Sequence, residues 1–177
     1  MSRLSTLSSN AIRAMYSSET QEAICMLVTI YDPNSTTDIV ALRLTDSFSG
    51  RLTDLTTTEE IVYGITSRTN PYVFVPMQIT LPTEQDTGIG QCSIILNYTS
   101  PEAIQLVRAQ ITKPTKVLLE LVLVSSPDTI EASFSDFYIT SVTYNADQIT
   151  FSLDMINLNR EPFPCFNFTP GYFPGLF

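Results

Sequence analysis

The length, composition and charge of the chain exclude several classes of protein. With 177 residues, 44% of them hydrophobic, the chain is long enough to build one domain around its own core. Only 15% of the residues are charged, and 18 acidic against nine basic side chains give a net charge of −9. This balance argues against avid nucleic-acid binding, which uses clustered cations, while a surface poor in charge is suited to association with proteins.

The first predicted element is a short helix near the start of the chain. Ser9 or Asn10 can cap it by accepting hydrogen bonds from first-turn amides, and we expect the helix to end at about Tyr16. Ile12, Met15 and Tyr16 recur at three- and four-residue spacing. This spacing gives the helix one apolar side, which we expect to pack on a sheet.

A strand covered on both sides is predicted over residues 23–31. This run is apolar on both alternating faces and stops at the turn-forming Asp32-Pro33-Asn34. A shorter strand is predicted over residues 39–45. Alternation there points Arg43 to one face and the apolar residues to the other, namely Val40, Leu42 and Leu44.

The middle of the chain is predicted to alternate loops with short strands. Residues 50–68 are polar apart from Ile61-Val62-Tyr63, so we expect one short strand set in loops. Residues 77–81 alternate in the manner of a half-buried strand, and residues 82–90 form a polar turn region. The sheet is expected to resume over residues 92–98.

A second helix and an antiparallel meander are predicted next. Ser100 can cap a helix that has Pro101 in its first turn and ends before Pro114. Turn signals at residues 126–128 and 145–147 then connect neighbouring strands. The strands are expected over residues 115–124, 129–134, 137–144 and 148–153.

Residues 162–177 form a distinct C-terminal segment, here called the arm. The arm has no charged residue, four prolines and six aromatic residues, so it is separated from a β-domain of residues 1–161. Aromatic side chains left in water favour aggregation, so we expect the arm to lie on a protein surface, either its own domain or a neighbouring subunit. Its predicted docking residues are Phe163, Phe166, Phe168, Tyr172, Phe173 and Phe177.

The cysteines give no sign of a metal site. Cys25, Cys92 and Cys165 lie far apart, no CxxC pair occurs, and the chain has no His, so the usual zinc constellations cannot form. We interpret them as reduced, mostly buried thiols. No signal-peptide core occurs in residues 1–10 and no apolar stretch approaches about 20 residues, so we expect neither signal-directed export nor a membrane span.

Catalytic patterns are weak, and we expect no enzyme and no cofactor. Without His the common general base is missing, and Gly88-Ile89-Gly90 is interpreted as a turn because a dinucleotide fingerprint needs a third glycine. The pairs Glu59-Glu60 and Glu84 with Asp86 are more typical of solvated loops than of glycoside hydrolysis. Oxygen-only calcium binding in residues 32–38 or 46–54 stays possible, although neither loop matches an EF-hand.

Several segments resemble a family encoded among the tail genes of tailed bacteriophages and prophages, long filed as a domain of unknown function. The resemblance covers nearly the whole chain. Its most specific part is the signature Glu161-Pro-Phe-Pro164, Phe168-Thr-Pro170 and Phe173-Pro-Gly-Leu-Phe177. The other segments are the opening helix with Met26-Leu-Val-Thr-Ile30, Ser67-Arg68-Thr69-Asn70-Pro71-Tyr72-Val73-Phe74, Ile79-Thr80-Leu81-Pro82, and Lys116-Val-Leu-Leu-Glu-Leu-Val-Leu-Val124 with Ser-Ser-Pro-Asp-Thr-Ile130.

The chain is more weakly similar to the amino-terminal domain of the lambda-type minor tail protein L. That protein carries a cysteine-rich metal-cluster segment after the domain. This chain ends without such a segment, so an iron–sulfur cofactor is not implied.

The resemblance implies a mainly β fold with one or two short helices, an antiparallel β-barrel or sandwich related to tail-tube and tail-hub domains. It implies a non-enzymatic structural subunit of the virion tail, assembled in the host cytoplasm, that forms a ring at the tail tip. The ring, trimeric or hexameric, would join the tail-tube protein to other tip proteins and let DNA pass. Its bore should be acidic or neutral, with candidate residues at 46–60 and 84–86.

Two other functions compete with the ring subunit. A receptor- or carbohydrate-binding module fits a β-rich domain with aromatic loops, although the absence of Trp weakens a sugar platform. A peptidoglycan hydrolase of the tail tip is the third hypothesis, and zymography on cell-wall substrate would detect it.

Overall fold

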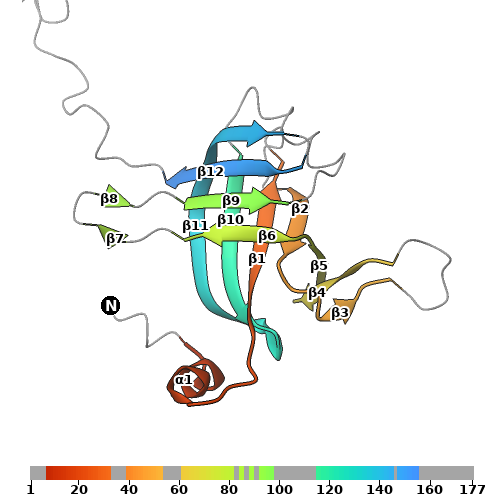
Figure 1. The fold of residues 1–177 in the computed structure, drawn as a ribbon, viewed down its shortest axis with the longest axis vertical. Helices are drawn as coiled ribbons and strands as arrows, with labels where there is room; N and C mark the ends of the chain where they lie inside the picture. Colours follow the sequence, from red (N-terminus) through yellow and green to blue (C-terminus); the bar gives the residue numbers. More distant parts are fainter. Residues whose placement is uncertain are drawn as a thin grey trace, which may run out of the picture.

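The computed structural model describes residues 7–32, 39–53, 61–81, 84–85, 88–89, 92–97, 115–145 and 147–155. This part of the chain is mainly β, as expected, with one short helix, α1 (Ser9–Tyr16) (Figure 1). The predicted helix at 100–113, the arm and Cys165 lie outside the described residues.

Within the described residues, ten strands form one continuous sheet, and two more form a separate hairpin. All neighbours in the large sheet are antiparallel except β2 and β5, which are parallel through Leu44 opposite Val73 and Thr45 opposite Phe74. The hairpin is β7 (Glu84–Gln85) with β8 (Gly88–Ile89). In sheet order the ten strands are β3 (Gly50–Arg51), β4 (Tyr63–Ser67), β5 (Asn70–Phe74), β2 (Val40–Thr45), β1 (Ile24–Tyr31), β10 (Lys116–Leu123), β11 (Ser126–Tyr144), β12 (Ile149–Met155), β9 (Cys92–Leu96) and β6 (Met77–Thr80).

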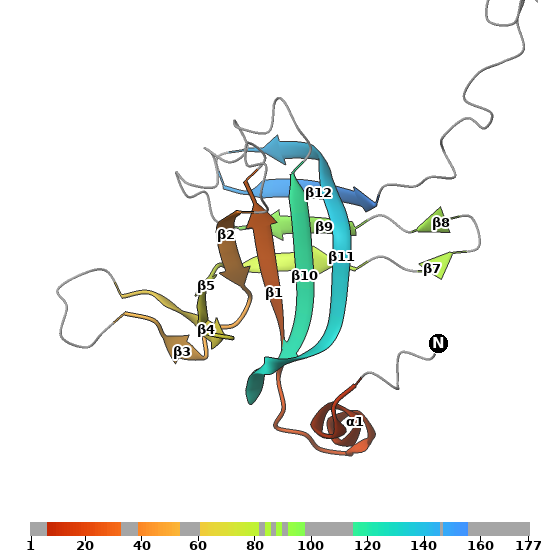
Figure 2. The ribbon, with the colours of Figure 1, turned by 180° about the vertical axis from the view of Figure 1, so that it is seen from behind.

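The long strand β11 bends the sheet over itself. Its first part pairs with β10 and its second part with β12, and Phe137 pairs with both, through Val117 and Met155. Strands β12, β9 and β6 therefore run across β1 and β10 (Figures 1 and 2). The expected separation into strands 129–134 and 137–144 was wrong. The gap between them falls at a register shift, where one extra residue bends β11 without ending it.

The main core lies between these two parts of the sheet. Alternate residues of β1 and β10 meet alternate residues of β9, β11 and β12, because successive side chains of a strand point to opposite faces. The fully buried members include Val28, Val117, Leu119, Phe137 and Ile149.

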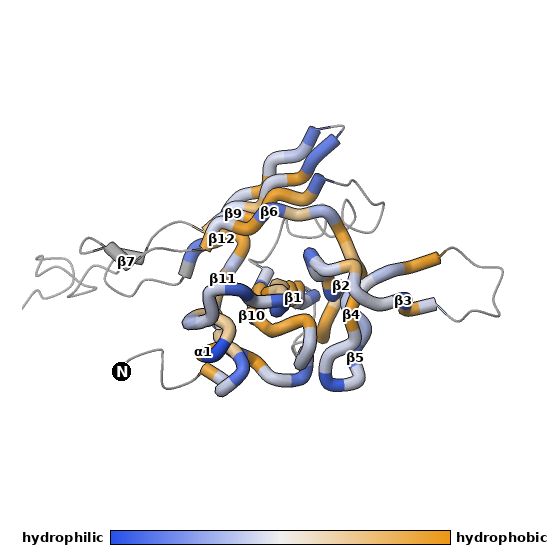
Figure 3. Tube along the Cα trace, turned by 60° about the horizontal axis from the view of Figure 1, so that its bottom comes forward, coloured by the Kyte–Doolittle hydropathy of each residue, from blue (hydrophilic) through white to orange (hydrophobic). Residues whose placement is uncertain are grey.

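The opposite face of β1 is covered as well, which confirms the prediction of a strand buried on both sides. Ile65 of β4 and Tyr72 of β5 pack on Leu27, Cys25 and Val122. Figure 3 shows hydrophobic segments along β1 and β10 at the centre of the molecule. The β4–β5 hairpin is thus a cover for the outer face of the central strands.

Glycine is required where β4 approaches β5. A Cβ atom added at Gly64 would lie 1.9 Å from the carbonyl oxygen of Tyr72 and 2.8 Å from a methyl carbon of Leu52. The two strands could not keep this spacing with any larger residue. A short strand was predicted at residues 61–63 and β5 was not predicted, because Gly64 and Asn70-Pro71 are typical turn signals.

A bulge changes the faces of β2. Ile30 pairs with Leu42 but Tyr31 pairs with Val40, so Ala41 is an extra residue on β2. Leu42 packs on the main core as predicted, whereas Val40 lies on the other face with Arg43. The expectation that Val40 shares a face with Leu42 was therefore wrong.

Helix α1 has the predicted bounds but a different cap and a different buried side. Ser8, not Ser9 or Asn10, caps the helix, and its hydroxyl accepts a hydrogen bond from the Ala11 N–H at 3.2 Å. Ala11 is buried, whereas Met15 and Tyr16 are exposed, so the predicted apolar side does not pack on the sheet.

The remaining strand predictions agree with the structure. β6, β9, β10 and β12 lie where strands were predicted, and β10, β11 and β12 form the expected antiparallel meander. Part of the predicted turn region 82–90 forms β7 and β8, so Gly88 and Ile89 are in a strand. No helix among the described residues is long and apolar enough to cross a membrane.

Candidate functional site

The β4–β5 turn is fastened to the β10–β11 hairpin by an ion pair and two hydrogen bonds. The Arg68 guanidinium donates to both carboxylate oxygens of Glu120, with an Nη1 to Oε1 distance of 3.1 Å. The Ser67 hydroxyl donates to the Pro127 carbonyl at 2.7 Å, and the Arg68 backbone N–H donates to the Asp128 carboxylate. We call this set of contacts the latch.

The charges of the latch are unequally exposed. Glu120 is 3% exposed, while 39% of the Arg68 side chain is in contact with solvent. The hydrogen bonds to Glu120 raise the pKa of Arg68 above its ordinary value, so the guanidinium stays charged. A buried carboxylate without a partner would be costly, so Arg68 makes the burial of Glu120 possible.

The turn of the latch has a strained backbone. Arg68 and Thr69 have φ values of 48° and 66°, both in the left-handed region. A common two-residue β-hairpin turn requires positive φ at both of its central residues. Glycine and asparagine are preferred there, whereas β-branched Thr is disfavoured. The surrounding contacts therefore impose this conformation.

A groove of about 180 Å³ lies beside the latch on the outer face of β1, β2 and β5. Arg43 and Arg68 bring two positive charges to it against the single carboxylate of Glu120. The ring of Tyr31 also borders it, with the Lys116 ammonium 5.7 Å from the ring centroid. A cluster of cations on a chain of net charge −9 is a candidate binding surface for acidic groups.

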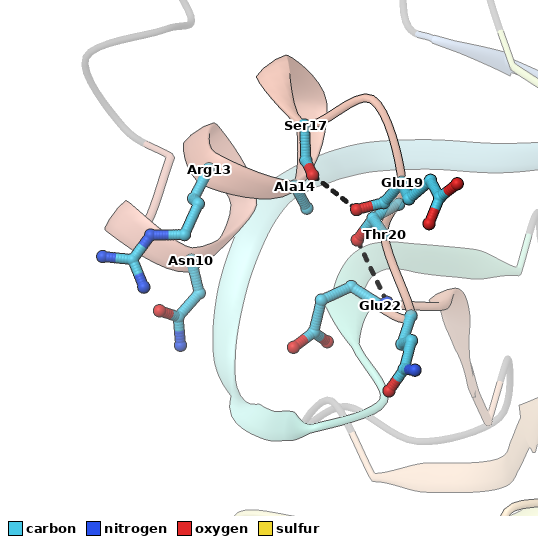
Figure 4. Close-up of a pocket in the computed structure, with 8 residues that line it drawn as sticks. Asn10, Arg13, Ala14, Ser17, Glu19, Thr20 and Glu22 are labelled. Atoms are coloured by element: carbon cyan, nitrogen blue, oxygen red, sulfur yellow. Dashed lines mark hydrogen bonds between the residues drawn. The ribbon is translucent and has the colours of Figure 1, made fainter.

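A second hollow, of about 250 Å³, lies between α1 and the segment that follows it (Figure 4). Asn10 and Arg13 project from the helix, and Glu19 and Glu22 project from the segment. Within the segment, the Glu22 N–H donates to the Thr20 hydroxyl at 3.1 Å. From the turn between β10 and β11, the Ser125 hydroxyl donates to the Glu22 carboxylate at 2.6 Å. These contacts anchor the connection between α1 and β1, and we interpret the hollow as structural.

Helix α1 is held by a buried carboxylate on β11. Glu131 is 2% exposed and accepts hydrogen bonds from the Ser8 N–H at 2.7 Å and the Ser8 hydroxyl at 2.5 Å. A negative charge at the start of a helix is favourable because the first amides carry partial positive charge. Glu131 therefore holds the capping residue Ser8 and positions α1.

The two described cysteines are free and buried, as predicted. Burial, aided by the charge of Asp46, raises the pKa of the Cys25 thiol to about 11, and burial raises that of Cys92 to about 11. At neutral pH both are therefore unreactive thiols.

An apolar surface is exposed at the end of the sheet formed by β3, β4 and β5. Phe48 is 71% exposed and packs edge-on against Phe74, with ring centroids 5.6 Å apart. Tyr63 is 48% and Ile61 51% exposed. Gly64 pairs with Val73, so Tyr63 and Phe74, one residue further on each strand, point to the same face. We call Phe48, Tyr63 and Phe74 the apolar patch.

The predicted site residues are only partly covered by the structure. The six aromatic residues of the arm, and Asp54, Glu59 and Glu60, lie outside the described residues, as do the side chains of Glu84 and Asp86. Asp46 accepts a hydrogen bond from the Met26 N–H at 2.8 Å, so this candidate for the bore is engaged within its own domain. In the part of the chain that is described, no group of three or more acidic or cysteine side chains could hold a metal ion.

No protein-family model matches the chain, and no curated protein sequence matches it significantly.

The latch, Glu131 and the apolar patch were not singled out in the sequence analysis. A weak signal existed for the latch, since Glu120 interrupts the apolar run of residues 117–124. A charged residue within a buried strand calls for a partner, although the sequence does not say which one. Arg68 lies 52 positions away, beyond the reach of any local pattern.

Proposed function

We propose that this chain is a structural subunit of the tail tip of a tailed bacteriophage and that copies of it form a closed ring. Such a ring would join the tail-tube protein to other tip proteins and let DNA pass through. The observation that carries the proposal is the apolar patch, where Phe48 is 71% exposed. Aromatic side chains gathered on one surface are typical of protein–protein contacts.

The composition and the resemblance point in the same direction. With 15% charged residues the surface has few charges to remove from water on association. Several of the segments that resemble tail proteins form the scaffold of the domain, with Met26 to Ile30 in β1 and Lys116 to Leu123 in β10. The turn Ser67–Asn70, also part of the resemblance, is the latch turn.

We further propose that the folded-over sheet is a β-barrel or sandwich related to tail-tube and tail-hub domains. The main core supports this proposal, because it lies between two parts of the sheet. Strands β1 and β10 contribute alternate side chains to it from one part, and strands β9 and β12 from the other. The ring order, three or six, stays open because both are compatible with closed symmetry.

The experiment that tests the function is protein mass spectrometry on purified virions. We expect the chain in particles at a fixed copy number that is a multiple of three, and cryo-electron microscopy of the tail should place it at the tip. Presence in infected lysate together with absence from particles would contradict the proposal.

A receptor- or carbohydrate-binding module is the second candidate, and the groove beside the latch favours it. Tyr31, Asn70 and Tyr72 line that groove with two arginines, a combination able to bind a polar ligand. Binding on a glycan array that is lost in Tyr31→Ala would support this alternative. We propose no enzymatic activity.

A further inference from the structure

The apolar patch lies far from the point where the described chain ends. β12 ends at Met155 on the side of the domain opposite β3, β4 and β5, and all three ribbon and tube views agree (Figures 1, 2 and 3). In a copy that presents its patch on one side, the described chain therefore ends on the other side. This is the geometry of a head-to-tail contact, which closes into a ring when the rotation allows.

The chain after Met155 includes a segment suited to such a surface. The arm, residues 162–177, has six aromatic residues and no charge, so its docking on apolar side chains buries no unpaired ion. Each aromatic side chain offers about 150 to 250 Å² for burial. Exposed rings such as Phe48 and Tyr63 can pack edge-to-face with aromatic rings, as Phe48 already does with Phe74.

We propose that the arm of one copy docks on the apolar patch of the next copy. The contact would be between subunits, and each copy would give one arm and receive one. This inference rests on the proposed ring function and names the contact that holds the ring together. The competing surface for the arm is its own helix α1, where Met15 is 63% and Tyr16 77% exposed.

Three full-length variants separate these possibilities. A patch variant carries Phe48→Ser and Tyr63→Ser, and an arm variant carries Phe168→Ser and Phe173→Ser. The matched control carries Met15→Ser and Tyr16→Ser, at two residues that are also exposed but lie on α1. Circular dichroism first establishes that each variant is folded, as expected from the exposure of the altered patch and helix residues.

Light scattering during size-exclusion chromatography then measures the assembly state. We expect oligomers for the wild type and the α1 control, and monomers for the patch variant and the arm variant. The decisive sample is an equal mixture of the last two. It contains one kind of intact arm and one kind of intact patch, so it should form a dimer and stop there.

A peptide of residues 162–177 with a lysine leader for solubility makes the test independent of wild-type assembly. It should bind the arm variant, whose patch is intact, and bind the patch variant at least about tenfold more weakly. A scrambled peptide with the same leader is the control.

A mixture that stays monomeric, together with equal peptide binding to both variants, would overturn the inference. Loss of assembly in the α1 control alone would assign the arm to α1 instead. If the wild type is found in virions but its oligomers are insensitive to all these changes, the docking inference fails while the proposed function stands. Absence from virions would refute the function whatever the peptide binds.

Discussion

Arg68 holds both carboxylate oxygens of Glu120, a residue that is 3% exposed and lies 52 positions further along the chain. Arg68 sits in a turn whose φ values are positive, and Glu120 lies in the central strand β10. This ion pair therefore links the covering β4–β5 hairpin to the middle of the sheet.

Replacement of Arg68 should destabilise the domain. Removal of one partner of a fully buried pair costs about 3 to 5 kcal/mol. Because 39% of the Arg68 side chain is exposed, water can reach Glu120 in its absence, and we expect Arg68→Met to cost about 2 to 3 kcal/mol. Glu120→Gln in the same chain should recover part of the loss. Urea unfolding measures both, with exposed Arg13→Ala as the control; equal stability of Arg68→Met and the control would contradict this role.

Thr69→Gly should stabilise the protein. Thr69 has a φ of 66°, which glycine adopts without the steric cost of a Cβ. The gain is reduced by the higher entropy of glycine in the unfolded chain, so we expect less than about 1 kcal/mol. Thr66→Gly, at an exposed position in β4 where φ is not positive, should instead lose about 0.5 to 1 kcal/mol. A lower melting temperature in both variants would show that the turn stores no strain.

Gly64→Ala should be far more harmful than Gly50→Ala. A Cβ at Gly64 would lie 1.9 Å from the Tyr72 carbonyl oxygen, whereas at Gly50 the nearest atom would be 3.1 Å away. Overpacking of this kind costs about 1 to 3 kcal/mol or more. Hydrogen exchange should show loosening at β4 and β5 in Gly64→Ala. Similar denaturation midpoints for the two variants would exclude the close approach.

The cap of α1 should depend on Ser8 and not on Ser9. Ser8 both accepts from the Ala11 N–H and donates to Glu131, so Ser8→Ala should cost about 0.5 to 2 kcal/mol. Ser9→Ala, one residue later, should change stability by less than about 0.5 kcal/mol. Hydrogen exchange of the α1 amides reports the difference. Equal protection in both variants would mean that the cap is elsewhere.

The buried thiols should make the protein less stable at high pH. The pKa of Cys25 and of Cys92 is about 11 in the folded state against 9.0 when exposed, so the neutral thiol is favoured by folding. The contribution of the neutral thiols to the free energy of unfolding is fully present below pH 9 and is lost as the pH rises toward 11. Between these values the unfolded chain releases the thiol protons more readily than the folded protein does. Urea midpoints between pH 7 and 11 should fall accordingly. Rapid labelling of both thiols by iodoacetamide in the folded protein at pH 8 would contradict their burial.

Local patterns predicted much of the sheet. β1, β6, β9, β10 and β12 were found because their residues alternate or are apolar throughout and because turn residues flank them. The failures have local causes as well. β5 begins with Asn70-Pro71, and β11 passes through a register shift near Phe134. At both places the local sequence resembles that of a turn.

The sequence by itself determined that the described part of the protein is mainly β, where most of its strands lie, and that Cys25 and Cys92 are buried thiols, because these properties depend on side chains at near neighbours. Only the tertiary structure decided which strands pair, that Ala41 forms a bulge, and that Glu120, Glu131 and Tyr72 are buried while Phe48, Met15 and Tyr16 are exposed. The burial of a charged side chain depends on a partner that the fold brings from a distant part of the chain. Hydrophobic residues of the same type thus lie in the core or at the surface according to long-range packing. The local periodicity of the sequence does not determine which of the two they do.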